Sequence, residues 1–269
     1  FLRRHFADVS GNLYEGTLSD FREGWSGTIE QKTNESTPDR RVIEAISAAV
    51  QVPDAELLGA LDALIDLDSF FTFWAVEVLI AHWDGYAGNT NNFWFYDDPD
   101  RGVVFIPWGP DGTFQPPRLL FEGRRAPDSV LAIGVLARRL YHHPEGQARY
   151  LDRIQRVLAE HWSAERMREQ LDRWTALVTP ALAPWQAPGH GGALAELRAW
   201  IEGQPGRVLG EIINGPEAWD IPLRGSFCQV EAGALEGSFE TTWGSWPSDN
   251  ALGASPQNRD ASRSTAPNA

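Results

Sequence analysis

One stretch of the chain, residues 82–114, decides the fold, and it reads HWDGYAGNTNNFWFYDDPDRGVVFIPWGPDGTF. Just upstream, residues 69–81 are apolar with few charges, which predicts a largely buried helix with Asp68 as its N-cap. After Asp84, residues 86–92 are rich in Gly and Asn and favour a loop that turns back and presents side-chain amides. The sequence therefore predicts carboxamides close to the helix end that carries Asp84.

A β-hairpin is predicted immediately after this loop. Residues 93–96 and 103–106 are rich in β-forming side chains, and they flank residues 97–102, which are typical of a longer turn. The second strand leads into the segment PWGPDG, which contains Asp111. We therefore expect the hairpin to return Asp111 to the region where Asp84 lies.

Oxygen-bearing side chains from these segments form a candidate site. Asp84, Asn89, Asn92 and Asp111 offer carboxylate and carboxamide oxygens, which suit the hard cations Mg²⁺ and Mn²⁺. Each of these residues alone is typical of a turn or of a solvated loop. Their joint spacing predicts that they converge on one point.

Protein kinases place their catalytic groups in the same order along the chain. A helix is followed by an Asp that orients or deprotonates the acceptor hydroxyl, an Asn five residues later on Mg²⁺, a hairpin, and an Asp on the metal. The five-residue spacing from Asp84 to Asn89 agrees with this order. The segments HWD and DGTF resemble the kinase HRD and DFG motifs only loosely.

On these residues the chain resembles the CotH spore-coat protein kinases, which are atypical members of the kinase-like fold. The resemblance rests on Asp84 followed by NTNN at 89–92 and an aromatic strand, and on IPW at 106–108 leading to Asp111 and Phe114. It covers about residues 1–214. It is supported upstream by GNLYE at 11–15, DF at 20–21 and IEQKTN at 29–34.

The resemblance implies that the γ-phosphate of ATP is transferred to Ser or Thr hydroxyls of a protein substrate with Mg²⁺ or Mn²⁺. The setting it implies is a bacterial cell surface, secreted fraction or spore coat. By the same resemblance Asp84 is the catalytic base, Asp111 holds the metal, and Asn89 or Asn92 supplies a second ligand, with Asn89 also at the cofactor. Many relatives carry Asp where this chain has Gly109, which puts a second acidic metal contact in doubt.

Lys32 is the single lysine of the chain and a candidate contact for a nucleotide phosphate. The alternative is a solvated loop residue beside Thr33 and Asn34, which is favoured because no glycine-rich loop is in view. A kinase fold places that loop and its phosphate-binding lysine on an amino-terminal β-lobe, and no such lobe precedes Phe1. We therefore expect the sequence to be a fragment.

The predicted fold class is α+β: a protein-kinase-like, mostly helical C-lobe with a central β-hairpin and a small β appendage. Periodicity and caps predict further helices at 40–50, 53–65, 129–141, 146–161, 164–178 (with Ser163 as N-cap) and 193–202, and residues 207–213 close this lobe. The expected domains are a remnant of the amino-terminal lobe and linker at 1–35, the kinase-like lobe at 36–214, the appendage at 215–247 and a disordered tail at 248–269.

Composition excludes several function classes. A net charge of −14 argues against a nucleic-acid partner, because phosphate neutralisation needs a basic surface. No run of eighteen apolar residues occurs, so no membrane span is expected. Cys228 is the single cysteine, which excludes an internal disulfide and a Cys-based zinc site. The sequence determines neither the cellular compartment nor the oligomeric state of the protein.

Two functions from other classes stay open. The first is a catalytically inactive pseudokinase or structural spore-coat or surface protein, which Gly109 and the missing amino-terminal lobe favour. The second is a carbohydrate- or surface-binding module, suggested by Phe239, Trp243 and Trp246 in the Trp-rich segment 214–246. Packing of these aromatic side chains against the helical lobe is the alternative for that segment.

Overall fold

The computed structural model describes residues 1–116 and 125–223. Residues 215–223 contain neither helix nor strand. The rest of the predicted β appendage and the whole predicted tail at 248–269 lie outside the described residues. The strands, tail disorder and glycan contacts predicted there stay predictions.

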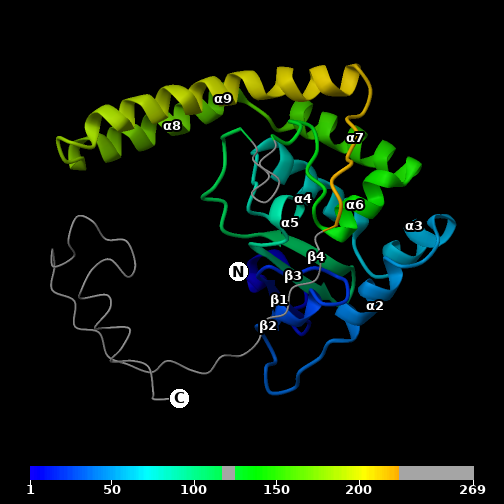
Figure 1. Cartoon of the computed structure of the whole chain (residues 1–269). Coiled ribbons are helices and arrows are strands. Elements are labelled where there is room, and N and C mark those ends of the chain that lie inside the picture. Colours follow the sequence, from blue (N-terminus) through cyan, green and yellow to red (C-terminus); the bar gives the residue numbers. More distant parts are fainter. Residues whose placement is uncertain (117–124, 224–269) are drawn as a thin grey trace, which may run out of the picture. The chain divides into compact units, whose positions relative to one another are not determined.

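The predicted hairpin is confirmed and belongs to a four-stranded antiparallel sheet (Figure 1). In the order β2-β1-β3-β4, its strands are β2 (Ile29–Gln31), β1 (Asn12–Gly16), β3 (Phe93–Asp98) and β4 (Gly102–Pro107). Segment 1–35 therefore supplies two strands to the sheet that contains the hairpin. The division of the chain at 35/36 stays a prediction.

Alternation of side chains gives the sheet one face that is buried in the core. Tyr14, Phe95 and Phe105 pair across neighbouring strands and point to this face. Helix α4 (Leu67–Leu79) covers it, and the ring centroids of Phe70 and Phe105 lie 4.9 Å apart. The sheet and α4 together fix both ends of the segment that carries the candidate site.

Helix α4 begins two residues earlier than predicted. Its N-cap is Asp66, whose carboxylate accepts a hydrogen bond from Ser69 N at 2.9 Å. The prediction of Asp68 as N-cap is wrong, because Asp68 lies inside the first turn of the helix, where its side chain pairs with Arg153. The predicted burial of the helix is confirmed, since most of its side chains are inaccessible to solvent.

Four of the other predicted helices lie close to their expected positions: α2 (Arg41–Ala49), α3 (Asp54–Asp62), α7 (Pro144–Glu160) and α8 (Ala164–Val178). Ser163 caps α8 as predicted, and its hydroxyl accepts a hydrogen bond from Arg166 N at 3.3 Å. Three short helical turns, which were not predicted, are α1 (Leu2–His5), η1 (Ser26–Thr28) and η2 (Thr179–Ala181).

The helix predicted at 129–141 starts later, and α6 spans Val135–His142. Residues 129–134 are not helical because their backbone groups bond to distant partners, as when Trp74 Nε1 donates to Leu131 O at 2.7 Å. The buried Asp20 carboxylate accepts from Val135 N at 3.1 Å and so caps α6. A cap supplied from so far along the chain leaves no local sequence signal.

The helix predicted at 193–202 and the segment 207–213 that closes the lobe belong to one helix, α9 (Ala187–Ile213), which lies beside α8 (Figure 1). Proline removes one backbone donor and normally breaks a helix. Here Trp200 and Val208, both buried, anchor the helix before and after Pro205. Within the described part of the chain, no helix combines the length and the apolar character needed to cross a membrane.

Candidate active site

Asp84 lies just beyond α4, after a left-handed residue at Ala81 (φ 51°). Its Oδ1 accepts hydrogen bonds from Asn89 Nδ2 at 2.6 Å and Asn91 Nδ2 at 3.1 Å, and its Oδ2 accepts from Asn92 Nδ2 at 2.8 Å. A carboxylate only accepts, so each carboxamide turns its NH₂ group toward Asp84 and its oxygen away. These four residues are called the Asp84 cluster below.

The carboxamides reach Asp84 because residues 86–89 form a helical turn. This turn, α5 (Tyr86–Asn89), stands where the Gly and Asn content predicted a loop. It requires glycine at position 88, since a Cβ there would lie 2.3 Å from the carbonyl oxygen of Trp83. Thr90, in the left-handed conformation (φ 54°), ends the turn.

A buried carboxylate of α4, Glu77, holds α5 in place. It is 1% exposed, and its two oxygens accept hydrogen bonds from Tyr86 N at 3.0 Å and Ala87 N at 2.9 Å. The segment between α4 and α5 passes so close to this carboxylate that a Cβ on Gly85 would lie 2.2 Å from Glu77 Oε1. Sequence reasoning missed Glu77, although a charged residue inside an apolar helix is a signal for a buried polar role.

His82 connects the Asp84 cluster to the second loop of the site. The ring is buried, and its Nε2 forms a hydrogen bond of 3.1 Å with Gly109 O. Its Nδ1 lies 3.5 Å from Glu77 Oε1, which is within ion-pair distance but too long for a good hydrogen bond. Burial lowers the pKa of His82, but Glu77 and the Gly109 carbonyl outweigh it, so the pKa lies above its usual value.

The turn that carries Asp111 packs against the Asp84 cluster. A Cβ on Gly109 would lie 3.1 Å from Asn92 Cγ, and a Cβ on Gly112 would lie 2.9 Å from Trp83 Nε1. Asp111 stands between these two contacts and is exposed. The structure therefore places the Asp111 turn beside the cluster, with its carboxylate open to solvent.

Gly109 has a left-handed backbone (φ 55°) as well as its close approach to Asn92, and both disfavour a larger side chain at this position.

Within residues 1–116 and 125–223, no group of three or more His, Cys, Asp or Glu side chains is arranged to hold a metal ion. A cation at this site would therefore depend on carboxamide oxygens as well as carboxylates.

Lys32 follows β2, and its Nζ pairs with Glu15 Oε2 at 2.7 Å and with Glu30 Oε2 at 2.6 Å. Hydrogen bonds to Glu15 and then Glu30 raise the pKa of Lys32. These ion pairs tie β1 to β2. The geometry favours this local role, and a contact between Lys32 and a nucleotide stays a prediction.

Asp20, in a segment that contributes to the family resemblance, also supports α5. Its Oδ1 accepts from Tyr86 Oη at 3.0 Å, and its Oδ2 accepts from Arg22 Nε at 3.0 Å. Burial raises the pKa of Asp20, while Arg22 opposes that rise. Because Asp20 also caps α6, this buried side chain connects the segment between β1 and β2 with both α5 and α6.

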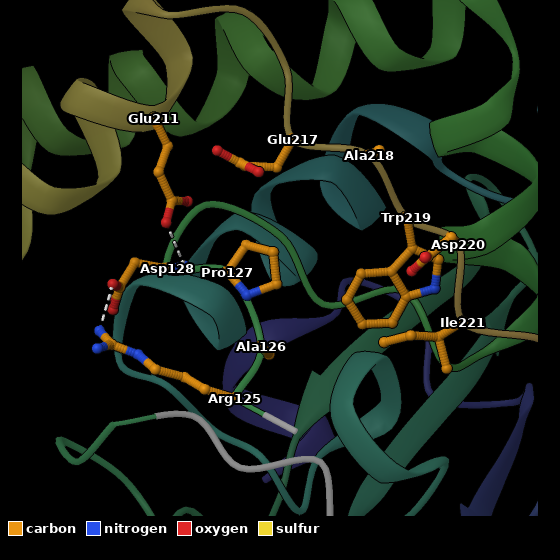
Figure 2. A pocket seen from close by; sticks show the side chains of 10 residues that line it. All are labelled: Arg125, Ala126, Pro127, Asp128, Glu211, Glu217, Ala218, Trp219, Asp220 and Ile221. Atoms are coloured by element: carbon orange, nitrogen blue, oxygen red, sulfur yellow. Dashed lines mark hydrogen bonds and ion pairs between the residues drawn. The ribbon is translucent and has the colours of Figure 1, made fainter. Parts of the chain in front are cut away.

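A separate pocket of about 460 Å³ is built around Asp128, and none of the predicted site residues lines it (Figure 2). Asp128 Oδ2 pairs with Arg125 Nη2 at 2.8 Å, and Oδ1 lies 3.4 Å from Arg207 Nε. Glu211 accepts from the amides of Asp128 and Ser129 at 3.1 and 2.8 Å. Asp128 Oδ1 makes no hydrogen bond, but both carboxylates have ion-pair or amide partners within the chain, so we assign them a structural role at the end of α9.

The fold and the site together define an α+β protein in which a carboxylate at a helix end is held by carboxamides beside a second acidic loop. A family model described as CotH kinase protein matches residues 1–202. The chain belongs to the CotH kinase family, which confirms the resemblance found in the sequence. No curated protein matches the chain.

Glu77→Gln is expected to lower the free energy of unfolding by about 2 kcal/mol, because a buried carboxylate that accepts from two amides becomes a group with one accepting oxygen. Urea unfolding followed by tryptophan fluorescence measures the change. The matched control, Glu169→Gln at an exposed position of α8, should change stability by less than about 0.5 kcal/mol. An unfolding free energy equal to that of the wild type would contradict the role assigned to Glu77.

Proposed function

We propose that this chain transfers the γ-phosphoryl group of ATP to Ser or Thr hydroxyls of a protein substrate with Mg²⁺ or Mn²⁺. Membership of the CotH kinase family implies a kinase-like function. The observation that carries the proposal further is the Asp84 cluster, in which three carboxamides hold one carboxylate beside the Asp111 turn. A kinase-like C-lobe and a bacterial surface or spore-coat setting are part of the same proposal.

The residues present fit a divalent cation. Each amide of the cluster donates its N–H to Asp84, so its oxygen faces away from that carboxylate. The Oδ1 of Asn91 accepts from Leu18 N at 3.1 Å. In keeping with the family resemblance, we assign Asp111, with Asn89 or Asn92, as the residues that would hold the ion. When bound, the ion would neutralise the charge of the triphosphate.

Asp84 is assigned to the acceptor hydroxyl. Its side chain is partly exposed, and the three N–H donors fix both of its oxygens. As the hydroxyl oxygen bonds to the γ-phosphorus, its proton passes to the Asp84 carboxylate. The bond between the γ-phosphorus and the β–γ bridging oxygen breaks, and its electron pair leaves with ADP. Glu77 and His82 are positioning residues, since they hold the two loops and contact no reacting atom.

Metal removal tests the proposal on the whole chain. With γ-labelled ATP, Mg²⁺ and a mixed Ser/Thr protein acceptor, labelled phosphate should appear on protein. Excess EDTA should reduce transfer by about 100-fold or more, and added Mn²⁺ or Mg²⁺ should restore it. Transfer that is equally fast in EDTA, or absent with both metals, would contradict the proposed function.

A pseudokinase or structural coat protein is the second candidate, and Gly109 is the observation that favours it. The transfer assay, read together with calorimetry, separates the two: a pseudokinase would show no transfer to any acceptor, whether or not it binds Mg·ATP. The enzyme would show both binding and transfer. The carbohydrate-binding alternative depends on residues outside the described part of the chain and stays a prediction.

A further inference from the structure

An apolar groove of about 280 Å³ borders the loop that carries Asp111, and Phe114 forms one side of it. The rest of its lining comes from α8 and α9, whose apolar side chains there are Met167, Leu171, Trp174, Leu197 and Ile201. Phe114 lies three residues after Asp111, and its backbone N–H donates to Ile80 O at 2.7 Å. Ile80 is the C-cap of α4, four residues before Asp84. Phe114 therefore connects the groove to both acidic segments of the candidate site.

The side of the groove on α8 is an amphipathic stripe that the fold leaves largely uncovered. Met167, Leu171, Trp174 and Val178 recur at intervals of three and four residues, the spacing that places side chains on one face of a helix. Of residues 164–178, all of which the structure describes, Leu171 alone is buried, whereas Trp174 is 61% exposed and Val178 45%. Packing of α8 on α9 therefore leaves an exposed apolar surface, and such surfaces mark interaction sites on soluble proteins.

Arg166 gives the groove a positive edge. Among the described residues that line the groove it alone is charged, and its exposed side chain makes no hydrogen bond or ion pair within residues 1–116 and 125–223. Two other arginines of the same helix pair are neutralised, because Arg168 pairs with Glu202 at 3.0 Å and Arg198 with Asp172 at 2.6 Å. An acidic residue of a partner would therefore meet a guanidinium with all of its donors free, the best geometry for a carboxylate.

We propose that this groove docks the protein acceptor by binding one of its large apolar side chains that stands next to an acidic residue. The apolar lining takes the side chain, and Arg166 takes the carboxylate. The inference rests on the proposed function, because the docked segment would present a Ser or Thr hydroxyl to Asp84. The position of the groove beside the Asp111 turn favours an acceptor over a second copy of the chain.

Docking away from the reacting atoms predicts an effect on KM rather than on kcat, since the same contact is made in the bound substrate and in the transition state. The probe is a set of synthetic peptides with one Ser at varied distance from a Phe-Glu pair, assayed on the full chain with Mg·ATP. Matched sets replace this pair with Ala-Glu or with Phe-Lys. The wild type should prefer the best Phe-Glu peptide by about 10-fold in kcat/KM over each matched peptide.

Variants of the groove should shift this preference. Trp174→Ala should raise KM for the Phe-Glu peptide about 10-fold with kcat within about two-fold of the wild type, and Trp174→Phe should recover most of the loss. Arg166→Glu should make the Phe-Lys peptide the better substrate. Trp185→Ala, at an exposed tryptophan outside the groove, should leave every KM unchanged. Anisotropy of labelled peptides on Asp84→Asn should show the same preferences in binding without transfer.

Four results would overturn the docking groove. Equal kcat/KM for the three peptide sets would do so and leave the proposed function intact. A loss in Trp174→Ala that lies in kcat would show that this side chain acts through the Asp111 turn. Dimers that Trp174→Ala dissociates, without any peptide preference, would assign the groove to a second copy of the chain. Peptide binding with no transfer to any peptide or to the mixed protein acceptor would refute the proposed function, and the acceptor role of the groove with it.

Discussion

Asp84→Asn is expected to reduce kcat for phosphoryl transfer about 1,000-fold while the affinity for Mg·ATP stays within about two-fold of the wild type. The new side chain has the same shape but is not a base. It also offers a single accepting oxygen to the three amides that Asp84 now binds. Stopped-time transfer assays and calorimetry on the same preparation measure the two quantities separately.

A double variant separates the chemical role of Asp84 from its structural role. In Asp84→Asn with Asn92→Asp, a carboxylate at position 92 faces the new NH₂ group, so the hydrogen bond of 2.8 Å is rebuilt in the opposite direction. Thermal stability should recover, and kcat should not. Asp100→Asn, at the exposed hairpin turn, is the matched control and should be fully active. Wild-type turnover in Asp84→Asn would remove Asp84 from the mechanism.

Asp111→Ala is expected to abolish transfer, with a loss of about 1,000-fold or more, and to weaken Mg·ATP binding as well. The physical reason is that Asp111 would supply the carboxylate that holds the cation, whereas the neighbouring position is Gly109. Asp111 is exposed, and within the described residues it forms no hydrogen bond or ion pair. Its removal should therefore leave thermal stability unchanged.

Transfer, calorimetry and a thermal melt on Asp111→Ala give three independent measurements. Loss of activity with an unchanged melt would assign Asp111 to the reaction rather than to the fold. Asp111→Glu, which keeps the carboxylate one methylene farther out, should retain weak Mn²⁺-dependent activity. Full transfer by Asp111→Ala would mean that the cation, if it is needed, lies elsewhere.

Local signals predicted part of this structure well. The hairpin follows from two aromatic and β-branched runs around a turn, and α8 follows from Ser163 and a regular amphipathic pattern. Two aspartates near the start of α4 offer equal local signals, however. Both pair with an arginine, so ion pairing does not decide between them. Asp66 N donates to Val103 O on β4 at 3.0 Å, and this long-range contact holds the chain where the Asp66 carboxylate caps the helix.

The candidate site, too, was predicted in part from local signals and depends in part on tertiary contacts. The five-residue spacing predicted that Asn89 would lie near Asp84, and the structure places Asn89 Nδ2 at 2.6 Å from it. The helical turn that makes this possible depends on Glu77, whose partners Tyr86 and Ala87 are nine and ten residues away. A charged residue inside an apolar helix signals that Glu77 has a buried polar role, but the identity of its partners is a tertiary property that the local pattern does not contain.

The backbone at Gly109 has a consequence for comparisons across the CotH family. The backbone is left-handed here, and the Cβ of an acidic residue at this position would lie 3.1 Å from Asn92 Cγ. The carboxamide of Asn92 would therefore have to shift. Asp is among the residues that adopt the left-handed conformation, so a relative with Asp there could keep this turn if the Asn92 side chain shifts slightly. Because Asn92 is itself a candidate ligand, that shift would change the oxygens offered to a cation, so ligands of the ion should be transferred between relatives by coordinates and not by sequence position.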